Sequence, residues 1–339
     1  MSSSSSSSSS TRSQLTTGIN GLAMVNAIHP NSGATLQVYL YGANVTSYCP
    51  YGINTQDVLF VSSKAIFDGV KPIRGGIPIA FPQFAAQGPL PMHGFARTNL
   101  WTLDNIQDEQ ECTSITLSLT NNDTTYAIWP HKFRLVYRII FNSTLLTTTL
   151  EVHNPKDNTN SEEASSSFTF EALLHSYFAT GVNSINDENG GSVRINGLEG
   201  TQYLSKPQNN ALCNEASNNF PLIGEVDRIY LLNNNEVTIT GIQNTNNNTD
   251  NNKSFNSIRV QRKAAIRDAS PGLRQVVEHS QLDVVVWNAG PVKCASIADF
   301  GPEDWHNYVC IEPGRVSKPA ELAPGKLWYI QQTITPITN

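Results

Sequence analysis

Short runs of β-branched and aromatic residues recur along almost the entire chain, and each is bounded by Gly, Pro, Asn or Asp. Such runs are typical of β-strands. No long stretch shows the period of about 3.6 residues that marks an amphipathic helix. The sequence therefore predicts an all-β fold. The expected strands are Leu36–Leu40, Ser114–Leu119, Phe133–Phe141, Leu145–Val152, Ser167–Phe178, Glu236–Ile239, Ile258–Arg262, Leu282–Trp287 and Leu327–Thr335.

The expected strand over Phe168–Phe178 has two different faces, because alternate side chains of a strand point to opposite sides. The apolar face predicts a core surface and consists of Phe168, Phe170, Ala172, Leu174, Ser176 and Phe178. The polar and aromatic face consists of Thr169, Glu171, Leu173, His175 and Tyr177. Sugars are commonly held by aromatic rings beside hydrogen-bonding groups. We therefore expect the second face to line a sugar-binding cleft.

The 339 residues contain no Gly/Pro-rich linker and no internal repeat, which favours one domain over residues 17–339. Residues 1–16 include a long serine run and predict a disordered tail. Residues 243–256 are almost all Asn, Thr, Asp and Ser and predict a loop inserted at the surface. Such an insertion adds little to the entropy of loop closure.

Charge and cysteine content exclude several functional classes. The formal net charge of −6 argues against a general nucleic-acid binder, which would need a basic face. The five cysteines are widely spaced and include no C-x-x-C pair, so we expect reduced thiols in a cytoplasmic protein. No apolar run reaches the roughly 20 residues of a membrane span. We expect a monomer whose partner is a small molecule.

A few segments of the chain look unlike ordinary scaffold strands. Four such segments are Arg74–Phe84, Met92–Arg97, Leu174–Phe178 and Cys310–Gly314, and Glu225–Tyr230 is a weaker fifth. Arg74 and Arg97 could together hold a phosphate through charge-assisted hydrogen bonds. They could equally be solvated or paired with nearby acids.

The other candidates also have two interpretations. His175 could titrate near neutral pH, or it could be a core histidine with satisfied hydrogen bonds. Glu312 precedes a Pro-Gly turn signal, and Glu312 and Asp227 could each be a solvated acid. His93 could brace a turn. The sequence contains no metal-ligand spacing, nucleotide-binding motif or serine-hydrolase elbow, which leaves acid–base chemistry by His and carboxylates.

Taken together, the segments resemble the hexose-6-phosphate mutarotases, the glucose-6-phosphate 1-epimerase branch of the aldose 1-epimerase family. The motifs R-G-G-I-P, H-G-x-A-R, H-[ST]-Y-F, D-x-x-Y and C-I-E-P-G occur in the order of that branch. Val286–Asn288 and Ala298–Phe300 also look like that branch. The resemblance extends from about residue 22 to about residue 332.

The resemblance implies a galactose-mutarotase-like β-supersandwich of large antiparallel sheets. It implies His175 as the catalytic histidine and Glu312 as the catalytic carboxylate, with no cofactor and no metal. Arg74, Arg97 and Asp227 fall on substrate-binding positions, and His93 lies beside them.

The expected reaction is the interconversion of the α and β anomers of a hexose 6-phosphate. Glu312 would act as the base and His175 as the acid, while the arginine pair holds the phosphate. An epimerase for a neutral hexose and a non-catalytic carbohydrate-binding module on the same fold remain as alternatives. One departure from the family concerns Met92, which stands where relatives carry a sugar-contacting Gln, and a thioether is only a very weak acceptor.

Overall fold

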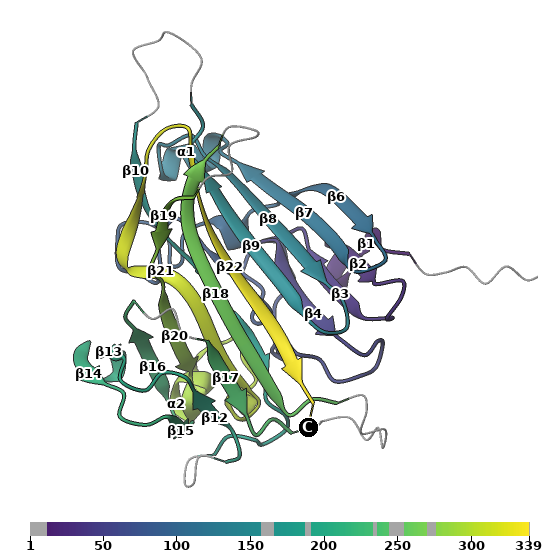
Figure 1. Cartoon of the computed structure of the whole chain (residues 1–339), viewed down its shortest axis with the longest axis vertical. Coiled ribbons are helices and arrows are strands. Elements are labelled where there is room, and N and C mark those ends of the chain that lie inside the picture. The colour runs from purple at the N-terminus through teal and green to yellow at the C-terminus, as the bar shows by residue number, and fades with distance from the viewer. Residues whose placement is uncertain are drawn as a thin grey trace, which may run out of the picture.

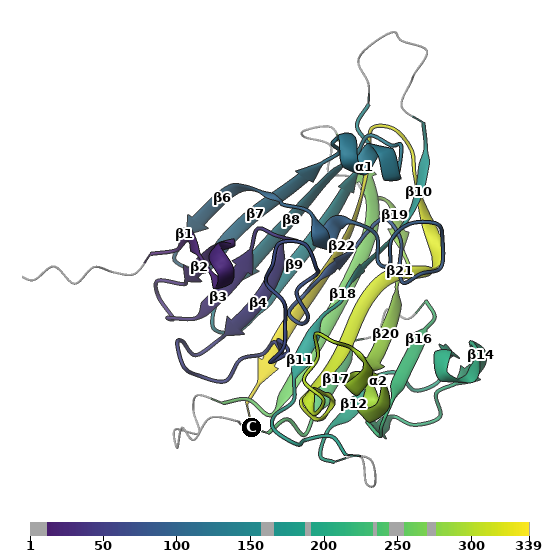
Figure 2. The same cartoon turned by 180° about the vertical axis from the view of Figure 1, so that it is seen from behind.

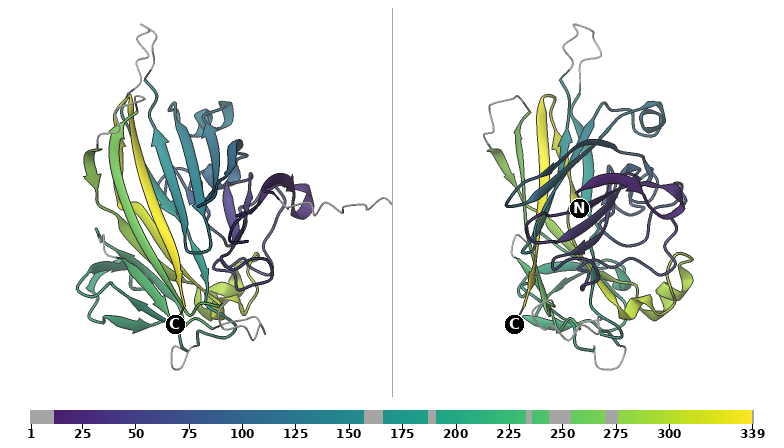
Figure 3. Two further views of the ribbon diagram at one scale, coloured as in Figure 1. Left: turned by 45° about the vertical axis from the view of Figure 1, so that its right-hand side comes forward. Right: turned by 90° about the vertical axis from the view of Figure 1, so that its right-hand side faces the viewer.

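The computed structural model describes residues 12–156, 166–186, 191–232, 236–243, 254–269 and 276–338. Within these ranges, antiparallel strands form three sheets. The smallest has the order β1-β2-β3-β4 and lies at one side of the two large sheets, as Figure 3 shows. Its strands are β1 (Gln14–Thr17), β2 (Ala23–Ile28), β3 (Thr35–Tyr39) and β4 (Asn44–Cys49).

The ten-stranded sheet spreads across the front of Figure 1. In order, its strands are β15 (Asn219–Pro221), β12 (Arg194–Asn196), β17 (Val237–Thr240), β18 (Ser257–Asp268), β22 (Lys326–Ile337), β9 (Leu146–His153), β8 (Arg134–Phe141), β7 (Thr113–Thr120) and β6 (Thr102–Asp108), and β19 (Val276–Ser280) pairs with β18. β9 illustrates why such sequences form strands. It is rich in leucine, threonine and valine, and its side chains are alternately buried and half-buried.

The eight-stranded sheet is seen from the other side in Figure 2. In order, its strands are β14 (Ala211–Asn214), β13 (Gln202–Ser205), β16 (Val226–Tyr230), β20 (Asp283–Asn288), β21 (Tyr308–Leu322), β10 (Phe168–Leu174) and β5 (Ile79–Ala80), and β11 (Tyr177–Ala179) pairs with β21. The helices are short: α1 (Asp123–Ile128), α2 (Gly290–Ser296) and the 3₁₀ turns η1 (Ile19–Gly21), η2 (Ala96–Thr98), η3 (Lys206–Gln208) and η5 (Asp304–His306). No helix among the described residues has the length and apolar character needed to cross a membrane.

The main hydrophobic core lies between the two large sheets. Phe170 of β10 packs edge to face against Trp328 of β22, with 5.4 Å between ring centroids. The hydroxyl of Ser176 forms a buried hydrogen bond with the side-chain amide of Gln332 on β22. The face of the eight-stranded sheet that carries Phe170 and Ser176 is therefore turned toward the ten-stranded sheet, and its other face is available for a site.

The all-β prediction is confirmed, and every expected strand overlaps an observed one. The segment Phe168–Phe178 is not one continuous strand, however, because it breaks between β10 and β11. At the break the N–H of His175 bonds to the carbonyl of Pro78, and the N–H of Ser176 bonds to that of Leu174. The expected polar face also differs, because His175 and Tyr177 are buried rather than lining an open wall.

The turn expected at Pro313–Gly314 is wrong, because both residues lie inside β21. β21 runs between β20 and β10, and pairing on both sides keeps the segment extended despite its turn-forming residues. Several short strands also escaped sequence-based prediction, because they hold too few residues to show a period.

The chain termini and insertions can be compared with the expected domain limits only in part. Gln14–Thr17 form β1 and pair with β2, so regular structure begins before residue 17. Residues 1–11, and residues 244–253 of the Asn-rich segment, lie outside the described residues. At the end of that segment Phe255 is buried, and its N–H bonds to the side chain of Gln56.

Candidate active site

The antiparallel register of β21 brings His175 and Glu312 face to face. Leu173 pairs with Gly314 on one side of the strand break, and Tyr177 pairs with Cys310 on the other. His175 lies midway between Leu173 and Tyr177, and Glu312 lies midway between Gly314 and Cys310, so the two residues fall opposite each other. The Nδ1 atom of His175 lies 3.4 Å from Oε1 of Glu312. The fold thus joins the two residues that the sequence singled out for acid–base chemistry.

Both members of this pair are buried, with 8% of His175 and 1% of Glu312 exposed. Burial, followed by the neighbouring Asp227 carboxylate, raises the pKa of Glu312 well above its usual range. Burial, followed by nearby His93 and two arginines, lowers the pKa of His175 well below its usual range. Burial therefore makes Glu312 a stronger base and a protonated His175 a stronger acid than either would be in water.

Asp227 lies on β16, in line across the sheet with Cys310 of β21. It pairs with Trp287 of β20, and Trp287 pairs in turn with Cys310 of β21. Oδ2 of Asp227 lies 3.4 Å from Nζ of Lys293, which is also 3.2 Å from a carboxylate oxygen of Glu225. Burial raises the pKa of Asp227, although nearby lysines oppose this shift. The arrangement places a fixed carboxylate beside the acid–base pair, where it could accept hydrogen bonds from sugar hydroxyls.

The guanidinium of Arg74 is already engaged. Its Nε and Nη2 both donate to Oδ1 of Asp299, at 3.2 and 3.1 Å, and Nη1 donates to the hydroxyl of Tyr177 at 3.3 Å. Its charge also lies over the ring of Phe300, 4.9 Å from the centroid. Burial opposes its charge, but Tyr177 and Asp299 outweigh burial and raise the pKa of Arg74. The alternative in which this arginine pairs with a nearby acid is therefore the one observed.

Arg97 has a different environment. Nη2 donates to the carbonyl of Met92 at 2.9 Å, while Nε is buried without a hydrogen-bond partner. No described carboxylate lies within ion-pair distance of it. Burial, followed by the charge of Arg74, lowers the pKa of Arg97 to about 10. A cation in this position would be stabilised by an anionic ligand.

His93 is held in one tautomer by the backbone. The N–H of Ala85 donates to Nδ1 of His93 at 3.3 Å, which leaves the hydrogen on Nε2. Burial, followed by Arg97 and other cations, lowers the pKa of His93 well below its usual range. Its ring centroid lies 5.5 Å from that of His175. His93 thus presents a neutral N–H donor beside the acid–base pair.

The turn that carries His93 depends on Gly94. His93 has a φ of 62° and Gly94 a φ of 69°, both in the left-handed region. A Cβ atom on Gly94 would lie 2.0 Å from the carbonyl oxygen of Phe81, so no other residue fits there. The side chain of Met92, just before this turn, is 60% exposed. The thioether therefore points largely to solvent, and only the Met92 backbone takes part in the site.

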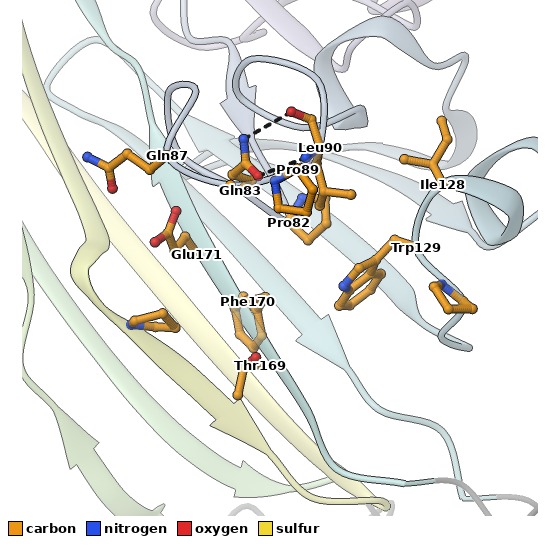
Figure 4. Close-up of a pocket in the computed structure, with 13 residues that line it drawn as sticks. Pro82, Gln83, Gln87, Pro89, Leu90, Ile128, Trp129, Thr169, Phe170 and Glu171 are labelled. Atoms are coloured by element: carbon orange, nitrogen blue, oxygen red, sulfur yellow. Dashed lines mark hydrogen bonds between the residues drawn. The ribbon is translucent and has the colours of Figure 1, made fainter.

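Gln83 braces the loop between β5 and His93. Its Nε2 donates to the carbonyls of Ala85 and Leu90, and its Oε1 accepts from the N–H of Leu90, each at 3.1 Å. A cavity of about 430 Å³ lies against this loop and includes Gln83, Trp129 and Glu171 in its wall, as Figure 4 shows. Neither member of the acid–base pair lines it.

Sequence reasoning assigned no role to Lys206, Asp299 or Cys310. Lys206 follows β13, yet its ammonium lies 4.8 Å from the ring centroid of Phe84, which follows β5 at the other side of the sheet. Asp299 lies in a segment already noted as similar to the family, although its ion pair with Arg74 could not be anticipated. No local pattern indicated Lys206, because its position depends on how two distant loops meet.

Comparison with known proteins identifies the family of this chain. The sequence profile of the aldose 1-epimerase family matches residues 24–335. A protein of Cenchrus ciliaris named "Putative glucose-6-phosphate 1-epimerase" is 33% identical over 298 residues, which are 86% of this chain and 78% of that protein. A protein of Escherichia coli K12 with the same name is 28% identical over 319 residues, covering 93% of this chain and 91% of that protein.

Solved structures share the fold. The YeaD protein of Salmonella typhimurium has a TM-score of 0.71 at 22% identity, covering 96% of this chain and 97% of that one. The galactose mutarotase related enzyme of Lactobacillus acidophilus has a TM-score of 0.63 at 18% identity, covering 92% and 97%. The expected galactose-mutarotase-like fold is thus confirmed. Because the family profile and the Cenchrus relative both span most of the chain, this protein belongs to the aldose 1-epimerase family.

Proposed function

We propose that this protein interconverts the α and β anomers of a hexose 6-phosphate, as a glucose-6-phosphate 1-epimerase does. The observation that carries the proposal is the buried contact of 3.4 Å between His175 and Glu312, beside an arginine with no acid partner among the described residues. A buried acid–base pair suits proton transfer, and an unpaired Arg97 suits an anionic substrate. The names of the Cenchrus and Escherichia coli relatives support the same substrate.

The reaction needs two proton transfers in each direction. To open the ring, Glu312 takes the proton of the anomeric hydroxyl while protonated His175 gives its proton to the ring oxygen. The bond between the anomeric carbon and the ring oxygen breaks, and an open aldehyde forms. After rotation about the bond between the first two carbons, the ring oxygen attacks the opposite face of the aldehyde. Glu312 then returns a proton to the new hydroxyl, and His175 takes one from the ring oxygen.

The remaining residues of the site would hold the substrate. Asp227 would accept hydrogen bonds from sugar hydroxyls, and the Nε2–H of His93 would donate one. Arg97 would bind the phosphate, because its guanidinium has donors that no described side chain satisfies. Arg74 would shape this part of the site through Asp299 and Tyr177 rather than bind the phosphate directly.

An epimerase for a neutral hexose is the second candidate. The ion pair between Arg74 and Asp299 favours it, because that pair leaves one arginine rather than two for a phosphate. A non-catalytic sugar-binding module is disfavoured, since burying an imidazole and a carboxylate together costs free energy that a binding surface need not spend.

The test follows the anomers directly. Freshly dissolved α-glucose 6-phosphate and α-glucose would each be mixed with the purified protein, and the approach to anomeric equilibrium would be followed by NMR. We expect faster exchange of both sugars than in buffer, with a clear preference for the phosphate ester. Equal acceleration would favour the neutral-hexose enzyme. No acceleration of either sugar would refute mutarotation.

A further inference from the structure

Three potential metal ligands meet at the acid–base pair. Cys310 and Glu312 are two residues apart on β21, so their side chains share one face of the strand. Tyr177 pairs with Cys310, which brings His175 alongside both. A ring nitrogen of His175, Sγ of Cys310 and a carboxylate oxygen of Glu312 all lie within 4.8 Å of one another. Sequence spacing could not reveal this group, because the histidine is far from the other two in the chain.

Two atoms of this group lack hydrogen-bond partners. Nδ1 of His175 and Oε2 of Glu312 are buried, and neither makes a hydrogen bond to a described residue, although Nδ1 lies 3.4 Å from Oε1 of Glu312. Both side chains are at least nine-tenths buried, and Cys310 is a buried free thiol. Buried polar atoms without partners are rare in folded proteins, and each asks for an explanation. A cation would coordinate the lone pairs of the imidazole, the carboxylate and the thiolate together.

We propose that His175, Cys310 and Glu312 form a binding site for a thiophilic divalent cation, in the first place Zn²⁺, which inhibits the enzyme. Imidazole nitrogen, thiolate sulfur and carboxylate oxygen are the donors that zinc takes in proteins. Tetrahedral zinc holds such donors about 3.3–3.6 Å apart. The 3.4 Å between Nδ1 of His175 and Oε1 of Glu312 already matches this separation. No pair in the group is more than 4.8 Å apart, so a small movement of the Cys310 side chain would complete the site. The fourth position would hold water.

Charge balance supports the same assignment. Zinc binds the thiolate and the carboxylate forms, and their two negative charges neutralise the ion. This matters because Arg74 and Arg97 lie close enough to depress the pKa of His175 and would repel an uncompensated cation. A carboxylate and imidazole alone would leave the complex with a net positive charge. Cys310 is therefore the residue on which zinc binding depends.

Inhibition follows because the ion would occupy the acid–base pair itself. Zinc bound to the imidazole and the carboxylate removes the lone pairs that would accept protons from the sugar. Zinc and sugar would therefore compete for one site. This inhibition rests on the proposed function, whereas the binding of the ion does not.

The first experiment measures binding without using activity. Zn²⁺ would be titrated calorimetrically into the untagged protein, and Co²⁺ would serve as a probe whose near-ultraviolet absorption band reports a cobalt–thiolate bond. We expect one site and a clear band in the wild type. Cys310→Ser should lose the band and bind Zn²⁺ roughly tenfold more weakly or worse. Glu312→Gln should also weaken Zn²⁺ binding, which provides a second variant should Cys310→Ser fold poorly.

Cys294→Ser is the matched control, because Cys294 is also a buried free thiol but lies outside the three-ligand group. It should bind both ions as the wild type does. A cobalt–thiolate band that survives Cys310→Ser would place the metal at another cysteine and overturn the proposal, as would the absence of any band in the wild type.

The second experiment adds activity. Zn²⁺ should slow anomer exchange in the wild type and in Cys294→Ser, a chelator should restore it, and glucose 6-phosphate should protect against it. Cys310→Ser should be inhibited much less, relative to its own rate without zinc. A Cys310-dependent band in a protein with no mutarotation would keep the metal site and refute the proposed function. Mutarotation in a protein that shows no such band would keep the proposed function and refute the metal site.

Discussion

The two arginines that the sequence presented as equivalent have different surroundings. Arg74 is bonded to Asp299 and Tyr177. Among the described residues, Arg97 donates only to a backbone carbonyl, and its buried Nε has no partner. A charge-assisted hydrogen bond contributes about 1.5–3 kcal/mol. The loss of Arg97 should therefore be felt most by an anionic substrate, and the loss of Arg74 by the structure of the site.

Replacing Arg97 by Ala should lower kcat/KM for glucose 6-phosphate by roughly one to two orders of magnitude, since each 1.4 kcal/mol is about tenfold. The value for glucose should fall much less, because a neutral hexose offers no anion. Arg74→Ala should instead impair both sugars. Anomer exchange measured by NMR over a range of concentrations checks this. Equal losses for both sugars in Arg97→Ala would remove this residue from phosphate binding.

Replacing Glu312 by Gln preserves the shape of the side chain and removes the proposed base. Turnover should fall by roughly 10²-fold or more, the contribution typical of one general base, while the sugar still binds. Glu171→Gln is the matched control, because a glutamine oxygen can still accept the hydrogen bond that Phe84 donates to Glu171 at 2.7 Å. It should keep normal turnover. Normal turnover in Glu312→Gln would place the base elsewhere, with Asp227 the next candidate.

At the scale of elements, the loop between β5 and His93 depends on one buried amide. Gln83→Leu would leave the Leu90 N–H and two carbonyls without their partner, which costs about 1–3 kcal/mol for a buried group. Urea denaturation should show this loss. Gln87→Leu, an exposed change in the same loop, should leave stability nearly unchanged. If both variants unfold at the wild-type urea concentration, Gln83 does not brace the loop.

The pairing of β8 with β9 contains a pH-sensitive carboxylate. Burial raises the pKa of Glu151, but hydrogen bonds from His153 and Arg138 outweigh burial and lower the pKa to about 2. A depressed pKa stabilises the fold above the unfolded value of about 4.3, and this contribution is lost as the pH falls from there toward 2. Glu151→Gln should therefore show a shallower loss of stability across this range in urea titrations. If the variant and the wild type lose stability equally as the pH falls, Glu151 does not contribute to the pH dependence.

At the scale of the whole molecule, the contact between the two large sheets carries much of the stability. Phe170 is 2% exposed and packs against Trp328 of the opposite sheet. Phe170→Ala should cost roughly 3–5 kcal/mol, because the core cannot refill the volume that the ring leaves. Thr169→Ala, at the exposed neighbouring position, should cost little. Equilibrium unfolding in urea measures the free energy of unfolding of both variants and so compares these losses.

The sequence by itself determined the local structure and the residues of interest. β9 could be predicted because its apolar residues, Leu146, Leu150 and Val152, all fall on one set of alternate positions, as in a strand with one buried face. This information lies within eight residues. The candidate residues could be named because their motifs occur in a family's order. Where a neighbouring strand opposed a local signal, prediction failed, as at Pro313–Gly314, whose turn-forming tendency is overridden by pairing on both sides.

Only the tertiary structure decided which of these residues meet. His175 faces Glu312 because Leu173–Gly314 and Tyr177–Cys310 pairing sets the register on both sides of a strand break. The arginine pair is divided because Asp299, far along the chain, binds one of its members. Strand formation depends on neighbours in sequence, whereas register, burial and the pKa of a buried group depend on segments that meet only when the chain folds.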